Sequence, residues 1–344
     1  MNASTADLRT WLAGRLEALC ACDSTSGRED AMLPVLRALL AELGAEVVEQ
    51  PVAPDRTNVL ATWGRPRVLF STHLDTVPPF LPPRLGGDVL HGRGACDAKG
   101  QIMAQLGAVR RLLAEGAEGL AWLGVVGEET DSAGARAALD LSGLLGDLRA
   151  LVNGEPTGLK LATGQRGVQH LCLHCRGRSA HSGNPELGHD ATWPLLDWLQ
   201  RLRELPRTAD PQLGPEVWNL GLLQAGEALN SVPASAQADL LLRSLPGSGF
   251  AEAVRRLAPP EGAMELRLDE PPDRYPEIPG FEHAAMPFGS DAPALRALVP
   301  DRTVVLAGPG SIAVAHTLEE HLALPELEAG VALNLRLARH FLDA

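Results

Sequence analysis

The chain has 344 residues, a length at which two domains are expected, and its 45% hydrophobic and 21% charged residues are ordinary for a globular protein. Thirty basic against 43 acidic side chains give a formal net charge of −13, which argues against a nucleic-acid partner or an anionic membrane surface. The five cysteines, an odd number, indicate a reducing compartment and not a disulfide framework. We therefore expect a cytoplasmic protein.

The first 21 residues predict an amphipathic helix, because charged residues such as Asp7 and Arg15 alternate with apolar ones. This segment lacks the uninterrupted apolar core of a signal peptide. The longest purely apolar stretch, residues 119–127, is too short to span a bilayer. A second helix is predicted over residues 30–43. We expect neither a signal peptide nor a transmembrane segment.

Four short apolar segments, each bounded by turn residues, predict buried strands: residues 67–71, 120–126, 148–152 and 303–307. A helix is predicted over residues 98–115, with Asp97 as its candidate N-cap. The alternation of strands and helices predicts an α/β domain, built on a mixed, mostly parallel sheet that helices cover.

The middle of the chain predicts a separate α+β unit. Its expected strands are residues 168–175, 236–243 and 264–268, and its expected helices are residues 191–202 and 250–257. The Pro-rich segment 269–280 suits a return to the first domain, whose sheet resumes at Thr303. We expect a discontinuous domain of residues 1–165 and 281–344, and an inserted domain of residues 166–280.

Histidine and carboxylate side chains follow the predicted strands of the first domain, at the end where α/β sheets bind ligands. They are His73 and Asp75 after the first strand, Asp97 before the helix, Glu128 and Glu129 after the second strand, Glu155 after the third, and His316 after the last. His73 and Asp75 lie two apart and so share one face of an extended chain, where the carboxylate can orient the imidazole or touch its ligand. A single His-x-Asp would be interpreted as a polar strand end. Because histidines and carboxylates occur at the ends of several strands, we interpret them as parts of one site.

The donor set of two histidines and at least three carboxylates suits Zn²⁺, and also Co²⁺ or Mn²⁺, better than a thiolate site would. The set exceeds what one tetrahedral ion needs, whereas two ions that share a bridging carboxylate would use all of it. In the adjacent pair Glu128 and Glu129, one carboxylate can bind metal while the other moves protons between water and a leaving amine.

Eight segments between residues 73 and 316 resemble, in family order, the motifs of the M20 family of co-catalytic zinc amidohydrolases, which includes acetylornithine deacetylase and succinyl-diaminopimelate desuccinylase. They are HLDTVP, GRGACDAKG, GEET, GEPTG, GRSAHSG, LNSVP, GSDA and GPG…AH. The resemblance implies that two zinc ions per chain are bound, one by His73 and Glu155 and the other by Glu129 and His316, with Asp97 bridging both. It also implies that Asp75 hydrogen-bonds His73 and fixes its tautomer, and that Glu128 is the general acid and base.

The resemblance further implies that the inserted domain is a lid through which the protein forms a homodimer. The lid residue His181 would then reach the substrate carbonyl oxygen of the neighbouring subunit. Arginines among the lid residues would bind a substrate carboxylate with a bidentate fork. The residues matched to substrate-binding positions are Arg166, Asn230, Arg243, Gly289 and Ser290. Without the resemblance, we would interpret four residues as ordinary polar residues on the surface of the inserted domain: His181, Arg166, Asn230 and Arg243.

The expected activity is hydrolysis of the amide bond of an N-acyl amino acid, with acetylornithine deacetylase as the first choice. Two alternatives use the same chemistry: a dipeptidase or carboxypeptidase, or a hydrolase that releases lysine or ornithine from a carrier protein in amino-acid biosynthesis. A serine hydrolase using Ser311 and His316 lacks the expected G-x-S-x-G elbow. A non-catalytic binding module on this fold would be expected to lack a ligand or the base, and here every position is filled.

Overall fold

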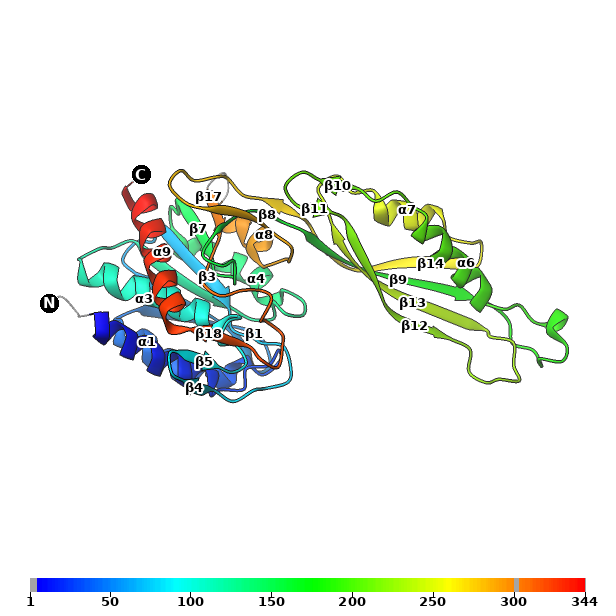
Figure 1. The fold of residues 1–344 in the computed structure, drawn as a ribbon, viewed down its shortest axis with the longest axis horizontal. Coiled ribbons are helices and arrows are strands. Elements are labelled where there is room, and N and C mark those ends of the chain that lie inside the picture. The colour runs from blue at the N-terminus through cyan, green and yellow to red at the C-terminus, as the bar shows by residue number, and fades with distance from the viewer. Residues whose placement is uncertain (1–4, 300–302, 344) are drawn as a thin grey trace. The chain divides into compact units, whose positions relative to one another are not determined.

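The computed structural model describes residues 5–299 and 303–343, and the chain divides into two compact units (Figure 1). Unit 1 runs up to Thr163 and takes in Tyr275–Ala284 and the segment from Ser290 onward. Unit 2 comprises Gly164–Arg274 and Ala285–Gly289. Sequence analysis placed the corresponding borders after residues 165 and 280, and it assigned the short segment Ala285–Gly289 to the first domain.

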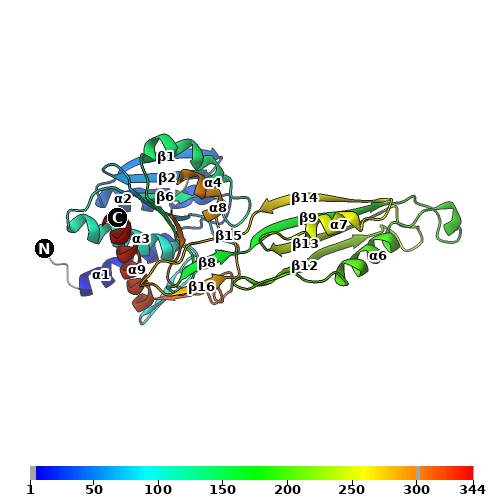
Figure 2. The same ribbon diagram turned by 90° about the horizontal axis from the view of Figure 1, so that it is seen from above.

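Unit 1 is built on a six-stranded mixed sheet in the order β1-β2-β6-β3-β7-β17. Figure 2 labels three strands of this sheet, β1, β2 and β6. The strands are β1 (Glu46–Ala53), β2 (Arg56–Trp63), β3 (Val68–His73), β6 (Leu120–Val125), β7 (Ala150–Asn153) and β17 (Thr303–Leu306). Strand β3 pairs in parallel with β6 and β7, and β17 pairs in parallel with β7, while the β1–β2 and β2–β6 pairs are antiparallel. Every residue of β3 and β6 is buried, as expected for a sheet that is covered on both faces. The predicted α/β fold class is confirmed.

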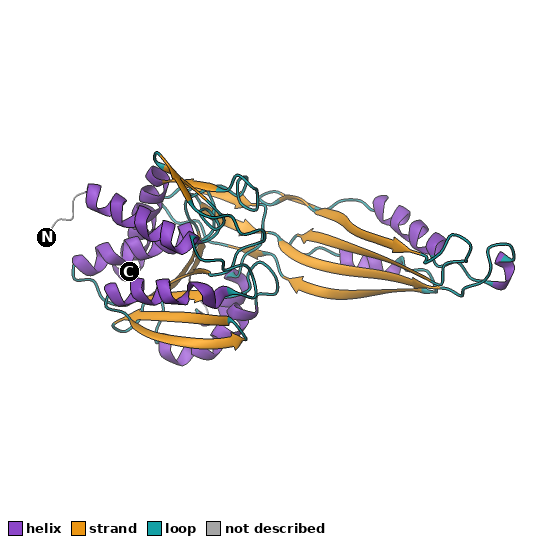
Figure 3. Ribbon diagram, turned by 90° about the horizontal axis from the view of Figure 1, so that it is seen from below, coloured by secondary structure: helices purple, strands orange, loops and turns teal. Residues whose placement is uncertain are grey.

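Long helices pack on this sheet (Figure 3). Helix α3 (Lys99–Ala114) contacts β3 and β6, and α9 (Leu324–Asp343) contacts β3 and β7. Helix α1 (Thr5–Cys20) packs on α3 and α9, and α2 (Leu33–Glu42) packs on α1. Among the residues that the structure describes, no helix combines the length and the apolar character needed to cross a bilayer.

Unit 2 is a four-stranded antiparallel sheet in the order β12-β13-β9-β14, with two helices against it. The strands are β9 (Gly167–Arg176), β12 (Val217–Ala225), β13 (Ser235–Ser244) and β14 (Gly262–Glu270), and the helices are α6 (Thr192–Arg203) and α7 (Phe250–Arg256). Alternate residues of β9, such as Leu171 and Leu173, form one core with Trp198 of α6, whose indole N–H donates to the Val254 carbonyl at 3.0 Å. Strand β12 lies at the edge of the sheet and is exposed along most of its length.

Gly107 is a position of α3 at which the helix packs closely against α1 and α9. A Cβ atom placed there would come 2.7 Å from a Val331 methyl group of α9 and 3.2 Å from a Leu12 methyl group of α1. We expect Gly107→Ala to lower the free energy of unfolding by about 1–3 kcal/mol, because added volume in a filled core displaces its neighbours. The measurement is the shift of the urea denaturation midpoint.

The matched control is Gly14→Ala on the exposed side of α1, where a Cβ atom meets nothing within 4 Å. Alanine favours a helix over glycine, so this variant should gain about 0.5–1 kcal/mol. Shifts of the same sign in both variants would contradict the described α1–α3–α9 packing.

Candidate metal centre and active site

Asp97 lies at the centre of the predicted cluster and directs one carboxylate oxygen toward each of two histidines. Its Oδ1 lies 2.9 Å from His73 Nε2, and its Oδ2 lies 3.3 Å from His316 Nε2. His316 Nε2 also lies 2.9 Å from Glu129 Oε1. Donor atoms of His73, Asp97 and Glu129 all lie within 4.8 Å of one another. A carboxylate in this position can bridge two cations.

This geometry corrects one sequence-based expectation, that Asp97 caps the following helix. Helix α3 begins at Lys99, its N-cap residue is Ala98, and no side chain caps it. The Asp97 carboxylate is directed toward the two histidines and not toward the helix N-terminus.

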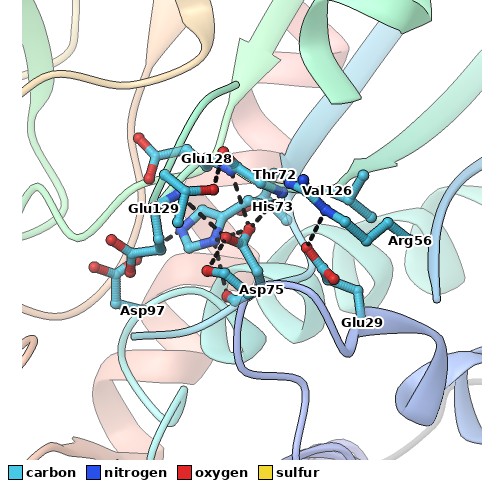
Figure 4. Close-up of polar contacts among 12 residues, drawn as sticks. Glu29, Arg56, Thr72, His73, Asp75, Asp97, Val126, Glu128 and Glu129 are labelled. Atoms are coloured by element: carbon cyan, nitrogen blue, oxygen red, sulfur yellow. Dashed lines mark hydrogen bonds and ion pairs between the residues drawn. The ribbon is translucent and has the colours of Figure 1, made fainter. Parts of the chain in front are cut away.

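Asp75 lies beside His73 and contacts it in two ways (Figure 4). The imidazole Nδ1 of His73 is 3.0 Å from the main-chain oxygen of Asp75 and 3.4 Å from its Oδ1. A proton on Nδ1 is donated to these oxygens, so Nε2 donates a second proton to Asp97 when the ring is charged and presents its lone pair to the site when the ring is neutral.

The Asp75 carboxylate also fixes the turn that carries Glu128 and Glu129, a task that sequence analysis did not anticipate. Its four other hydrogen-bond donors are the main-chain N–H groups of Gly127, Glu128 and Glu129, at 3.1–3.2 Å, and the hydroxyl of Ser26, at 2.7 Å. Ser26 was missed because nothing in its sequence surroundings links a turn residue to a strand end 49 positions away. One carboxylate thus aligns a histidine with two glutamates from another strand end.

Glu155 follows β7 and is buried, yet its Oε1 has no hydrogen-bond partner among the described residues. The preceding residue, Gly154, is tied to β3, since its N–H donates to the Ser71 carbonyl at 2.7 Å and its carbonyl accepts from the Thr72 hydroxyl at 2.9 Å. A buried carboxylate oxygen without a donor costs free energy unless a cation or a proton compensates it. The Glu155 carboxylate is therefore available to a cation or a proton.

The electrostatics of the cluster reflect several acids in a small volume. Burial, and then the charge of Asp97, raise the pKa of Glu155 well above its ordinary value. Burial, and then the charge of Glu155, also raise the pKa of Glu128 well above its ordinary value. Burial alone would raise the pKa of Asp97 too, but hydrogen bonds from His316 and His73 hold it well below its usual range. Hydrogen bonds to Asp97 and then to Glu129 raise the pKa of His316 to about 10.

The residues present fit a pair of divalent cations. Two imidazoles and three carboxylates are the ligand types that zinc, cobalt and manganese accept. Cations among these groups would relieve the repulsion between the carboxylates and would satisfy the Glu155 oxygen. Asp97 already directs one oxygen to each half of the set.

The expected substrate-binding residues of unit 2 lie at two opposite ends of its sheet. At one end, Arg243 pairs with Val168 across β13 and β9, and a Cβ atom on Gly289 would come 3.1 Å from the Val168 side chain. Arg166, one residue before β9, donates from Nε and Nη2 to the Leu213 carbonyl at 2.9 and 2.6 Å. Ser290 belongs to unit 1, where its hydroxyl accepts from the Ala292 N–H at 3.2 Å.

His181 and Asn230 lie beyond the other end of β9 and are exposed. The Ser182 N–H donates to the Asn230 carbonyl at 3.0 Å, and the Gly183 N–H donates to His181 Nδ1 at 3.1 Å. In the neutral ring the proton of His181 is therefore on Nε2, which makes that atom a donor. The strand between the two groups, from Val168 to Arg176, is about 27 Å long at the usual rise per residue.

Comparison with known proteins agrees with this fold. Peptidase family M20/M25/M40 matches residues 69–340, and the chain belongs to this family of metal-dependent hydrolases. A probable carboxypeptidase of Emericella nidulans is 32% identical over 361 residues, which cover 91% of this chain and 85% of the relative. The solved structure of a tripeptidase from Staphylococcus aureus has a TM-score of 0.78 at 18% identity and covers 96% of this chain and 99% of its own. A dinuclear metal-binding M20 peptidase of Bacillus subtilis has a TM-score of 0.73 at 17% identity, with coverages of 97% and 99%.

Because Asp75 accepts from three main-chain N–H groups at once, replacing it should loosen the turn that it holds. We expect Asp75→Asn to lower the free energy of unfolding of the metal-free protein by about 3 kcal/mol or more, since an amide turns an N–H donor toward other buried donors. Ser26→Ala removes one donor only and should cost about 1 kcal/mol. Urea denaturation of the chelator-treated proteins measures both.

Asp140→Asn is the control, because this aspartate is exposed and its replacement should change stability by less than about 0.5 kcal/mol. If Asp75→Asn proved no more costly than Asp140→Asn, the Asp75 carboxylate would not hold the turn.

Proposed function

We propose that the protein is a metal-dependent peptidase that hydrolyses the amide bond next to a residue with a free α-carboxylate, as a carboxypeptidase or dipeptidase does. The observation that carries the proposal is Asp97, which directs one oxygen toward His73 and the other toward His316. The related protein named as a probable carboxypeptidase supports this class of substrate.

We infer that two zinc ions are bound, with Co²⁺ or Mn²⁺ as alternatives. His73 and Glu155 would hold one ion, Glu129 and His316 the other, and Asp97 both. The solved dinuclear peptidase of similar fold supports a paired site. When bound, such a pair polarises the substrate carbonyl and makes water more acidic.

Glu128 moves the protons in this proposal. It accepts a proton from the attacking water and later gives one to the departing amine. Its raised pKa suits a group that must hold a proton between these two steps. Asp75 fixes the Glu128 main chain, so the base keeps its place beside the metal ligands.

The acetylornithine deacetylase subtype remains our prediction from the EPTG and AHSG segments, as an alternative to the peptidase. It uses the same groups on an acetyl amide. Release of lysine or ornithine from a carrier protein is a further alternative, against which the net charge of −13 argues, since an acidic carrier prefers a basic docking surface.

We infer a homodimer that forms through unit 2. Strand β12 leaves one edge of the sheet unpaired and exposes Leu222 (59%) and Leu223 (47%), the features of a strand that pairs with another chain. The separation of about 27 Å along β9 supports the same inference, because one small substrate cannot contact both His181 and Arg243 of a single chain. A second copy of the chain can supply the group that lies out of reach in the first copy.

Adjacent glutamates allow the catalytic assignment to be tested with a matched pair of variants. We expect Glu128→Gln to keep two zinc equivalents but to lose about 100-fold or more of its activity, because only the proton carrier is removed. Glu129→Gln should lose one equivalent, because a ligand is removed. Metal analysis and release of free amine from N-blocked dipeptides, N-acetylornithine and N-acetylcitrulline measure both properties.

The wild-type protein must lose activity to a chelator and recover it with zinc. Preference for N-acetylornithine over every dipeptide would assign the deacetylase subtype. Full activity in Glu128→Gln would contradict the proposed base.

Mixing two inactive variants tests whether His181 acts on the neighbouring subunit. Chains with Glu128→Gln and chains with His181→Ala should each be inactive. In a mixed dimer one site has an intact Glu128 and receives an intact His181 from the partner, so random mixing should restore about a quarter of the wild-type activity. No recovery after verified subunit exchange would contradict action across the dimer.

A further inference from the structure

Glu320 is a buried carboxylate that lies four residues after His316 and outside every motif that identified the site. It is 1% exposed, and its two oxygens face different partners. Its Oε1 accepts from the main-chain N–H groups of Gly94, Cys96 and Asp97 at 3.0, 3.1 and 3.0 Å. Its Oε2 accepts from Arg93 Nη1 at 2.6 Å, and Arg93 is also 1% exposed.

These contacts join two segments that are 223 residues apart. The first segment ends in Asp97, whose side chain does not cap helix α3 and so is not held in place by it. The second carries His316, whose backbone has a left-handed φ of 64° that a non-glycine residue adopts only when its surroundings enforce it. Glu320 thus connects the segments of the two groups that approach each other to 3.3 Å in the site.

The surrounding main chain strengthens this connection. The Gly92 N–H donates to the Glu320 carbonyl at 3.0 Å. Immediately after Glu320, strand β18 (His321–Ala323) pairs with β5 (Val89–His91), which lies just before the Asp97 segment. The β5–β18 strand pair therefore aligns the two segments. The Glu320 carboxylate then fixes the position of the residues between this pair and Asp97.

A general contribution to stability does not account for this arrangement. A buried ion pair such as Arg93–Glu320 adds little net stability, because both charges lose water. The three N–H groups bound by Oε1 belong to the four residues that end at Asp97, so the contact constrains that residue in particular. Residues that orient metal ligands in this way commonly change metal affinity 10- to 100-fold when altered.

We propose that Glu320 is a positioning residue that sets the distance between Asp97 and His316, and thereby the affinity for the cation that these two ligands share. The inference rests on the proposed paired-metal function. It predicts an asymmetry between the two cations. The first cation would also use Asp97, but its other two ligands, His73 at the end of β3 and Glu155 shortly after β7, are held by the central sheet. The first cation should therefore depend on Glu320 less than the second.

The test is a titration of metal-free protein with Co²⁺, followed by its visible absorption, in wild type, Glu320→Gln, Glu320→Asp and Glu319→Gln. Glu319 is the matched control, because it is the exposed neighbour and loses the same charge. We expect the second equivalent to bind about 10- to 100-fold more weakly in Glu320→Gln, with the first changed by much less. Glu320→Asp should show a smaller loss, and Glu319→Gln none.

Circular dichroism of the metal-free proteins monitors the fold, which a structural defect alone would disturb. If Glu320→Gln fails to fold, Glu320→Asp decides the outcome, because it keeps a charge to pair with Arg93. Wild-type affinity for both equivalents in the folded variants overturns the inference alone, and so does an equal loss of both. A wild-type protein that takes up no second equivalent overturns the paired-metal function and this inference with it.

Discussion

Buried acids cannot share a small volume unless each receives a compensating positive charge or donor, and this constraint organises unit 1. Asp75 and Glu320 meet it with main-chain N–H groups, three for each carboxylate. Asp97 meets it with two imidazoles, and Glu155 leaves one oxygen without a donor. Asp75 and Glu320 are therefore satisfied by main-chain donors, whereas Glu155 retains an oxygen that a cation or a proton could compensate.

The two satisfied carboxylates perform matching tasks. Each comes from one strand-end segment and binds the N–H groups of another, so each fixes the relative position of two segments that carry candidate ligands. Asp75 joins the end of β3 to the Glu128–Glu129 turn, and Glu320 joins the end of the His316 segment to Asp97. Because the donors are main-chain groups, the rotamer of the accepting carboxylate is the only one that these hydrogen bonds depend on, which suits a site that must keep its geometry during reaction.

Much of this could be predicted from the sequence, because the signals were local. Apolar runs located β3, β6, β7 and β17, and the polar residues that follow them are the ones that converge. Strands β1 and β12, which are exposed along most of their length, were missed, and so was the buried strand β2. Ser26 and Glu320 act across 49 and more than 220 residues, and no spacing rule predicts such contacts. The assignment of Asp97 as a helix cap was wrong because a local rule was applied to a residue whose partners are distant.

The order in which the parts of the site occur along the chain affects its biosynthesis. His73, Asp97 and the glutamates leave the ribosome early, but His316 and Glu320 follow only after all of unit 2 has been made. A chain that stops within unit 2 therefore contains Glu128 and part of the donor set but lacks His316 and Glu320. Incomplete chains should consequently be unable to assemble the full donor set, since its last member is translated after unit 2.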